Sequence, residues 1–231
     1  MRRIVIAIDG YAATGKSTTA RGVADVLGYL YIDSGAMYRA AAWYLWQKGI
    51  RCLEQMEEKT LIGLFQDFSL EMRQEGRGVK LSLQGRPLGE ELRRPEIGQL
   101  ASLVGTVAWL RERLVAEQRR LGEKGGIVMD GRDIGTVVFP EAPLKVFMKA
   151  ALETRVERRY QELAAQGLQV SRSHIQAELL ERDYRDEHRP LSPLRPAPDA
   201  RLLDTTSLTI PEQIAIVLRW AEELIYAPLT S

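Results

Sequence analysis

The residues best suited to chemistry lie near the N-terminus, where Gly10-Tyr11-Ala12-Ala13-Thr14-Gly15-Lys16-Ser17 has the spacing G-x-x-x-x-G-K-[ST]. Glycines let the backbone curl tightly, so that consecutive N–H groups point inward at phosphate oxygens. Lys16 supplies a positive charge for the β and γ phosphates, and the Ser17 hydroxyl is suited to Mg²⁺. The loop therefore predicts a nucleoside triphosphate site. Its members are Gly10, Tyr11, Ala12, Ala13, Thr14, Gly15, Lys16, Ser17 and Thr18.

Two further motifs follow predicted strands. In residues 32–39, Ser34 is suited to cap a helix, although an ordinary strand-to-helix turn with a surface arginine, Arg39, would look the same. In residues 128–136, Asp130 ends an apolar run, the usual place for a carboxylate that faces Mg²⁺ through water. Arg132 and Asp133 then emerge at the carboxyl end of the sheet, where ligands bind in open α/β folds, and a charged surface loop is the alternative.

Arginines recur at helical spacing in the C-terminal half. Arg182, Asp186 and Arg189 stand at i, i+4 and i+7, so they share one face of a predicted helix. An earlier helix opens with three more arginines, which are Arg155, Arg158 and Arg159. Acids balance arginines throughout residues 153–201, so spacing alone favours solvated, salt-bridged helix faces over a binding site.

An α/β architecture would bring these motifs to one edge of a sheet. Short apolar runs alternate with amphipathic stretches of helical length, and several runs are continuously apolar, as in strands buried on both faces. The alternation predicts a P-loop NTPase-type parallel sheet flanked by helices. The expected strands are residues 4–8, 29–32, 127–129, 144–148 and 201–203. The expected helices are residues 16–27, 35–48, 95–121, 152–166, 174–188 and 210–226.

Two segments break this alternation. Residues 69–73 and 79–83 each alternate apolar and polar side chains, and Glu75-Gly76-Arg77-Gly78 joins them as a turn. They predict an antiparallel hairpin, which we interpret as a small β insertion. Four prolines between residues 190 and 198 must end the preceding helix and carry the chain onward in extended form.

Composition excludes several classes of protein. The 231 residues are 45% hydrophobic and 27% charged, which suits one large folded α/β domain. A net charge of +1 provides no basic field, so no nucleic acid polymer is expected as a partner. Cys52 is the single cysteine, and no apolar run is long enough for a leader or a membrane span. We expect a cytoplasmic monomer with no membrane partner.

The chain contains no asparagine, and arginine far outnumbers lysine. Without asparagine there is no N-K-x-D motif to read guanine, which disfavours an ordinary GTPase switch and favours ATP. The absence of asparagine and the excess of arginine over lysine have two open explanations, heat tolerance and a GC-rich genome.

Taken together, the motifs resemble the bacterial cytidylate kinases, which are nucleoside monophosphate kinases. The motifs are the phosphate loop, residues 33–39, Asp130-Gly131-Arg132-Asp133-Ile134-Gly135-Thr136-Val137-Val138-Phe139-Pro140, and Glu181-Arg182-Asp183-Tyr184-Arg185-Asp186. The resemblance covers nearly the whole chain, and the hairpin matches the family's enlarged monophosphate-binding region. It implies Mg²⁺-assisted transfer of the γ-phosphoryl group of ATP to CMP or dCMP. One departure is Tyr11-Ala12-Ala13, where similar enzymes carry Pro-Ser-Gly or a like triplet, so a positive φ at Ala13 would be strained.

The resemblance also implies roles for individual residues. The phosphate of CMP would be held by Ser34, Arg39 and Arg132, with Arg189 on the phosphate side. Cytosine would be read by Ser102, Arg111 and Asp133, and the ribose held by Arg182 and Asp186. A lid over ATP would carry Arg155, Arg158 and Arg159, and Mg²⁺ would be held by Ser17 and, through water, Asp130. The expected catalytic set is Lys16, Arg132, Arg155, Arg158, Arg159 and Arg189. The expected parts are a core of residues 1–66, 96–150 and 190–231, an insertion of residues 67–95 and a lid region of residues 151–189.

Three other functions remain open on the residues alone. A kinase for another small acceptor, such as AMP, UMP or shikimate, is the nearest alternative. A nucleotide-controlled switch would hydrolyse its nucleotide slowly without any acceptor. A nucleic-acid-binding protein is the weakest alternative, since the net charge is only +1.

Overall fold

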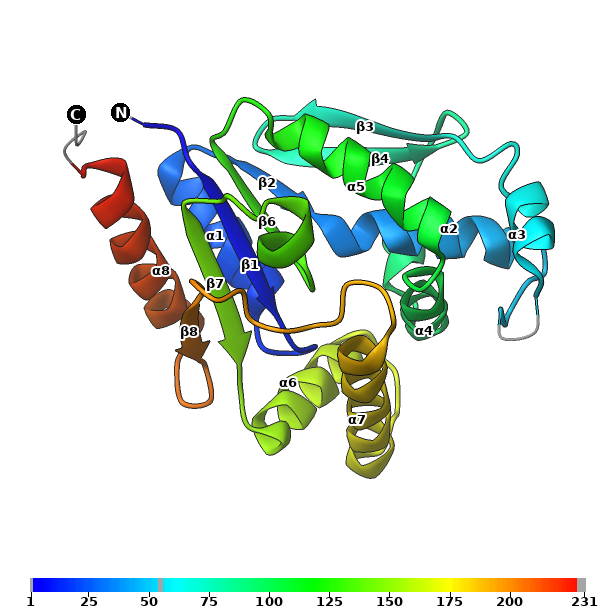
Figure 1. The fold of residues 1–231 in the computed structure, drawn as a ribbon. Helices are drawn as coiled ribbons and strands as arrows, with labels where there is room; N and C mark the ends of the chain where they lie inside the picture. Colours follow the sequence, from blue (N-terminus) through cyan, green and yellow to red (C-terminus); the bar gives the residue numbers. More distant parts are fainter. Residues whose placement is uncertain (1, 54–55, 228–231) are drawn as a thin grey trace.

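A five-stranded parallel sheet with the order β2-β6-β1-β7-β8 forms the centre of the molecule (Figure 1). The computed structural model describes residues 2–53 and 56–227. The sheet confirms the predicted fold class, and each predicted strand is present with bounds shifted by one or two residues. The strands are β1 (Val5–Gly10), β2 (Leu30–Asp33), β6 (Ile127–Gly131), β7 (Leu144–Lys149) and β8 (Arg201–Asp204).

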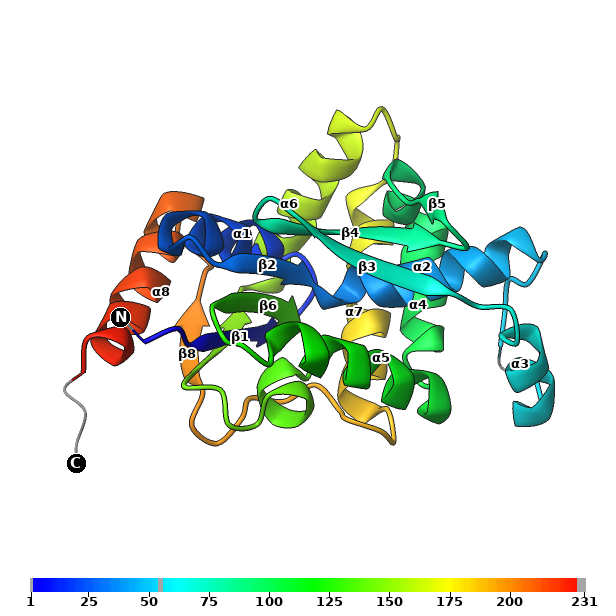
Figure 2. The same ribbon diagram turned by 90° about the horizontal axis from the view of Figure 1, so that it is seen from above.

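Helices cover both faces of the sheet, as Figure 2 shows from above. On one face, α1 (Lys16–Leu27) and α8 (Ile210–Ile225) pack over Ile6, Ile8 and their neighbours. On the other face, α5 (Ala108–Gly122) and the short π-helical segment η2 (Ile134–Val138) pack over Ala7 and Met129. The strands β1, β6 and β7 are therefore buried on both sides, which explains their continuously apolar sequences.

The predicted hairpin is present and belongs to a three-stranded antiparallel sheet of β3 (Leu70–Glu75), β4 (Gly78–Leu83) and β5 (Arg86–Pro87). Its β3–β4 turn contacts the edge of the central sheet, where the Tyr31 N–H donates to the Arg77 carbonyl at 2.9 Å. Two short helical segments flank the small sheet and were not predicted. They are α3 (Glu58–Leu64) and η1 (Glu90–Arg93).

The single helix predicted over residues 95–121 is wrong, because the structure has two helices there. The first, α4 (Pro95–Val104), ends at Gly105, and α5 begins at Ala108. The Thr106 hydroxyl donates to the Leu103 carbonyl at 2.7 Å, and competition of this kind with the helical hydrogen bonds favours a break. The break changes the direction of the chain between Ser102 and Arg111, two residues assigned to the same site.

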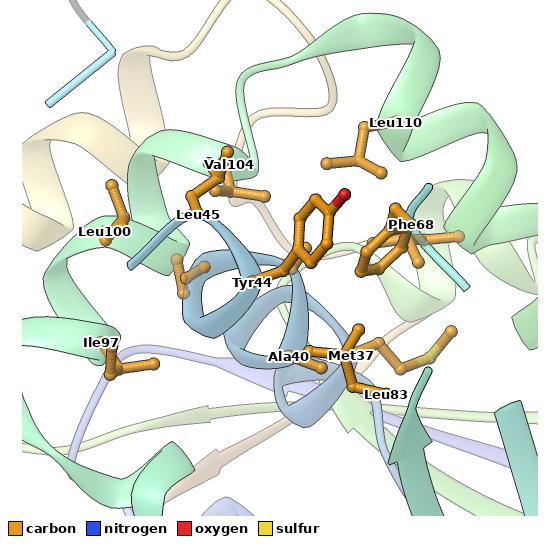
Figure 3. Close-up of a cluster of buried hydrophobic side chains, with 14 of the residues drawn as sticks. Met37, Ala40, Tyr44, Leu45, Phe68, Leu83, Ile97, Leu100, Val104 and Leu110 are labelled. Atoms are coloured by element: carbon orange, nitrogen blue, oxygen red, sulfur yellow. The ribbon is translucent and has the colours of Figure 1, made fainter. Parts of the chain in front are cut away.

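A cluster of buried apolar side chains fixes these two helices against α2 (Ser34–Gln47) and the small sheet (Figure 3). Tyr44 of α2 lies in its middle and packs against Phe68, with ring centroids 5.3 Å apart. Fully burying one such side chain stabilises the fold by about 1.5–3 kcal/mol. The cluster therefore packs α4 and α5 against α2, the helix that carries Ser34 and Arg39. Its other labelled members are Met37, Ala40, Leu45, Leu83, Ile97, Leu100, Val104 and Leu110.

The helices α6 (Leu152–Ala165) and α7 (Arg172–His188) follow β7 and lie beyond the carboxyl ends of the strands (Figure 1). They pack on each other and on Ala12 of the phosphate loop through Val156 and Ile175. The Ser171 hydroxyl caps α7 by accepting from the His174 N–H at 3.2 Å. The division of the chain into core, insertion and lid remains a prediction. None of the helices in the described ranges combines the length and hydrophobicity that a membrane span needs.

Candidate active site

A cavity of about 210 Å³ lies at the carboxyl ends of β1, β2 and β6, between the phosphate loop and helices α2, α4, α5 and α7. Lys16 and Ser17 of the loop line one side of it. The structure places around this cavity every residue that the resemblance assigns to CMP. These residues are Ser34, Arg39, Ser102, Arg111, Arg132, Asp133, Arg182, Asp186 and Arg189.

The phosphate loop takes its shape from two glycines. Gly10 has φ 147°, and a Cβ there would lie 2.0 Å from the carbonyl oxygen of Met148, so no other residue fits. Gly15 has φ 93° and is the N-cap of α1. Lys16 begins the helix, and its Nζ donates to the Tyr11 carbonyl at 2.7 Å. Burial, and next the charge of Arg132, hold the pKa of Lys16 well below its usual value.

Ala13 adopts a left-handed conformation with φ 59°, which confirms the strain expected from the sequence. Its neighbour Tyr11 connects the loop to α7, because the Tyr11 hydroxyl donates to Glu187 Oε1 at 2.5 Å. The Tyr11 ring also packs edge-on against Phe147, and the Arg155 guanidinium lies 5.3 Å from its centroid. These contacts stabilise a loop whose backbone conformation is otherwise unfavourable.

Asp130 accepts hydrogen bonds on both carboxylate oxygens. Ser17 Oγ donates to Oδ2 at 2.7 Å, and the Tyr31 hydroxyl donates to Oδ1 at 2.9 Å. Burial raises the pKa of Asp130, and the nearby Asp33 raises it further. The Ser17 and Asp130 oxygens are the hard ligands that Mg²⁺ prefers, and they lie beside Lys16 in the cavity. The residues present therefore fit a nucleotide-bound Mg²⁺.

The start of α2 differs from the prediction that Ser34 caps it. Asp33 is the N-cap: its Oδ1 accepts from the Ala36 N–H at 2.9 Å, and its Oδ2 pairs with Arg39 Nη2 at 2.6 Å. Ser34 is the first helical residue, and its hydroxyl donates to the Asp130 carbonyl at 2.6 Å. Asp33 has two acceptor oxygens on a longer side chain, so it satisfies the helix terminus and orients Arg39 at the same time.

Asp133 lies between two arginines from distant parts of the chain. Arg111 Nη2 of α5 donates to Asp133 Oδ2, and Arg189 Nη2 at the end of α7 lies 3.4 Å from Oδ1. All three side chains are less than 10% exposed. The Arg111 guanidinium also lies 5.7 Å from the ring centroid of Tyr38, another cavity residue. A buried carboxylate thus faces the cavity between two fixed positive charges.

A second ion cluster, centred on the buried carboxylate of Asp186, also lines the cavity. Arg132 Nε donates to Asp186 Oδ2 at 2.8 Å, and Arg182 Nε lies 3.9 Å from the same oxygen. Burial, and next the charge of Arg132, lower the pKa of Arg182 to about 10. Although burial raises the pKa of Asp186, the two arginines lower it by more, so this carboxylate stays ionised. The cluster therefore carries a net positive charge.

Three polar atoms at the cavity wall are buried but have no hydrogen-bond partner within the described ranges. They are Ser102 Oγ, Arg182 Nε and Arg189 Nη2. Buried donors are nearly always satisfied in native proteins, by protein, water or ligand. Their position in one cavity lined by five arginines points to an anionic ligand rich in acceptors.

The arginines expected on the lid do not line this cavity. Arg155 is buried and pairs with Asp183 of α7 at 2.7 Å. Arg158 donates to the Thr205 carbonyl at 2.6 Å, directly after β8. Arg159 lines an adjoining cavity of about 540 Å³ that also contains Ser17, Thr18, Arg39 and Arg182. All three arginines therefore lie near the phosphate loop: Arg155 and Arg158 also donate to the loop carbonyls of Ala12 and Thr14 at 3.4 and 3.3 Å, whereas Arg159 lines the adjoining cavity.

Sequence reasoning missed the roles of Tyr31 and Tyr38. Tyr38 belongs to the motif of residues 33–39, but an aromatic residue on a helix is ordinarily part of the core. Tyr31 lies within a predicted strand, where its ring is expected to be buried and its hydroxyl is overlooked. For Tyr31 the available signal was a buried hydroxyl that needs a hydrogen-bond partner.

Comparison with known proteins agrees with this geometry. The family profile described as Cytidylate kinase matches residues 6–223. The cytidylate kinase of Geobacillus thermodenitrificans is 42% identical over 224 residues, which cover 97% of this chain and 99% of that protein. The cytidylate kinase of Parabacteroides distasonis is 44% identical over 221 residues, covering 94% and 96%. A solved structure of an uncharacterized protein from Eubacterium ventriosum matches with a TM-score of 0.55 at 13% identity, covering 96% of this chain and 99% of that one, and supports the fold alone. The chain belongs to the cytidylate kinase family.

Proposed function

We propose that this protein transfers the γ-phosphoryl group of ATP to CMP, and also to dCMP. One observation carries the proposal: a single cavity joins Lys16 and Ser17 of the phosphate loop to all of the residues assigned to CMP. Membership of the cytidylate kinase family supports the same reaction.

The acceptor phosphate is held by Ser34, Arg39 and Arg132. A nucleoside monophosphate carries close to two negative charges near neutral pH, so its oxygen is already a nucleophile and needs no general base. His174 and His188 are both exposed on α7 and neither lines the cavity, which agrees with such a mechanism. The main obstacle is repulsion between two anions, and buried guanidinium groups reduce it because they bind phosphate bidentately.

Cytosine is read by Asp133, Arg111 and Ser102. The carboxylate accepts from the exocyclic amino group, while the arginine donates to the ring acceptors N3 and O2. Uracil reverses the pattern at both positions, so UMP would place a carbonyl against Asp133 in a dry site. The Ser102 hydroxyl, which has no hydrogen-bond partner within the described ranges, can donate to the base or accept from it. Arg182 and Asp186 hold the ribose.

The donor is bound by the phosphate loop. Lys16 leaves the Tyr11 carbonyl and pairs with the β and γ phosphates, where it stabilises the charge that develops during transfer. Mg²⁺ held by Ser17 and, through water, by Asp130 would neutralise part of the donor charge. Arg155, Arg158 and Arg159 belong to a lid whose closure excludes water, which would otherwise compete as the acceptor. Arg189 assists at the phosphate side.

A substrate panel tests the proposal. ADP release would be measured with purified protein, ATP and Mg²⁺ against CMP, dCMP, UMP, AMP and shikimate in turn. We expect kcat/KM to be highest for CMP and dCMP. Equal rates of ADP release with and without an acceptor would indicate a nucleotide switch. A preference for AMP or shikimate would contradict the assigned acceptor. A cytoplasmic monomer that binds no polynucleotide is part of the same proposal, and size-exclusion chromatography checks the monomer.

A further inference from the structure

Asp9 is a buried carboxylate that does not line the cavity and has no role in the mechanism above. It is 5% exposed and precedes Gly10, the first residue of the phosphate loop. Its Oδ1 accepts from the Ile134 N–H at 2.8 Å, and its Oδ2 accepts from the Gly135 N–H at 2.7 Å. These two N–H groups directly follow Asp133 in the chain. Asp9 therefore binds the backbone that carries Asp133.

The segment after Asp133 has little other support for its N–H groups. It enters η2, and the first N–H groups of a helical segment have no partner within it. The backbone is also closely confined, since a Cβ at Gly135 would lie 3.2 Å from Lys145 Cγ and 3.4 Å from Asp9 Oδ2. Lys145 is itself held by an ion pair with Asp199 at 2.9 Å. The backbone at Gly135 thus packs closely against both the Lys145 side chain and the Asp9 carboxylate.

Only a carboxylate suits this place chemically. An ionised carboxylate accepts on two oxygens, whereas the isosteric amide of asparagine accepts on one and would direct its NH₂ group at the second N–H. Burying a carboxylate is costly, and burial raises the pKa of Asp9 to about 7, despite the two backbone hydrogen bonds that lower it. Because burial of this carboxylate is unfavourable, we expect it to have a role, which is to hold the adjacent segment in its binding geometry.

We propose that Asp9 is a positioning residue for Asp133: by accepting from two consecutive N–H groups, it sets the direction from which the Asp133 side chain enters the cavity between Arg111 and Arg189. The inference rests on the proposed function, in which Asp133 reads the cytosine amino group. Because Gly10 follows Asp9 directly, the same side chain also fixes the distance between the base-reading segment and the phosphate loop. Asp9 thereby fixes the position of the acceptor base relative to the ATP bound at the phosphate loop.

The test compares kcat/KM for CMP and UMP in wild type, Asp9→Asn, Asp133→Ala and the double variant. We expect Asp9→Asn to narrow the CMP-to-UMP ratio by at least about fivefold, the typical effect of losing one intramolecular hydrogen bond, with KM for ATP within about twofold of wild type. In the Asp133→Ala background, Asp9→Asn should leave the ratio unchanged. The matched control is Tyr29→Phe, which removes a buried hydroxyl that accepts from the Ile4 N–H at 3.2 Å near the opposite end of β1. It should lower stability and leave the ratio at its wild-type value.

The outcomes separate this inference from the proposed function. If Asp133→Ala narrows the ratio but Asp9→Asn does not, the positioning role is overturned alone. If Asp9→Asn narrows the ratio equally with and without Asp133, it acts by another route, and the inference is again overturned. If Asp133→Ala has no effect, the base-reading role fails, and this inference fails with it. Should Asp9→Asn not fold, Gly135→Ala places a methyl group against Lys145 Cγ and Asp9 Oδ2, displaces the same segment and should narrow the ratio as well.

Discussion

Replacing Asp133 with alanine should affect stability and specificity separately, and the structure indicates the size of each effect. Asp133 is paired with Arg111 and lies 3.4 Å from Arg189, and all three side chains are less than 10% exposed. The alanine variant therefore leaves two buried guanidinium groups without their carboxylate. Breaking a buried ion pair by removing one partner lowers the free energy of unfolding by about 3–5 kcal/mol. Urea unfolding measures this loss.

The specificity effect is smaller in energy and more diagnostic. The wild-type carboxylate favours the cytosine amino group and disfavours the uracil carbonyl, and Asp133→Ala removes both effects. The CMP-to-UMP ratio of kcat/KM should narrow by at least about tenfold, equivalent to about 1.4 kcal/mol, which is within the worth of one hydrogen bond to a charged group. Initial rates for both acceptors at saturating ATP give the ratio.

A matched variant separates the two effects. Asp183 is another buried carboxylate, paired with Arg155 at 2.7 Å, but it does not line the CMP cavity. Asp183→Ala should lower stability and reduce turnover with CMP and UMP equally, leaving the ratio unchanged. If Asp133→Ala behaves in the same way, with lower stability and an unchanged ratio, Asp133 serves only the fold, and the reasoning about cytosine is refuted.

Three further predictions concern the phosphate loop and its base. Lys16→Ala should lose turnover by several orders of magnitude with an unchanged circular dichroism spectrum, because the ammonium stabilises developing charge; turnover within about tenfold of wild type would refute this role. Ala13→Gly should raise the free energy of unfolding by up to about 1 kcal/mol, since relief of the left-handed strain at φ 59° outweighs the added freedom of the unfolded chain. The control Ala12→Gly, at a residue with negative φ, should lower the free energy of unfolding by about 0.5–1 kcal/mol. If urea unfolding shows that both variants change this free energy in the same direction, the argument is contradicted. Burial in the folded state raises the pKa of Asp9 from 3.8 to about 7, so the folded protein binds this proton more tightly than the unfolded chain does. The resulting stabilisation is fully present below pH 3.8 and is lost as the pH rises through 7. Relative to Asp9→Asn, which does not titrate there, the wild type should lose about 2 kcal/mol of unfolding free energy between pH 5 and 7, and parallel pH profiles would exclude the raised pKa.

Local patterns in the sequence were sufficient for most elements of the fold. The helix predicted over residues 16–27 has the bounds observed for α1, since a glycine precedes it and another follows it. The strands β1, β6 and β7 were found because burial on both faces leaves continuously apolar runs. The failure at residues 95–121 has the same origin, because apolar spacing continues through Gly105 and shows no break. The break depends on hydrogen bonds that form only when the chain turns there.

The sequence by itself determined the chemistry at the phosphate loop and after β6, because in both places the functional groups lie within a few residues of one another. The spacing of Gly10, Gly15 and Lys16 already specifies how the backbone must surround a phosphate. The tertiary structure alone decided which distant charges meet: Asp133 follows β6, yet its partners Arg111 and Arg189 come from α5 and the end of α7. The spacing of arginines on α7 was equally compatible with a solvated surface. Burial distinguishes the two cases, because a charge removed from water is stable only when it is paired with an opposite charge. The packing of α4, α5 and α7 around one cavity determines which charges pair.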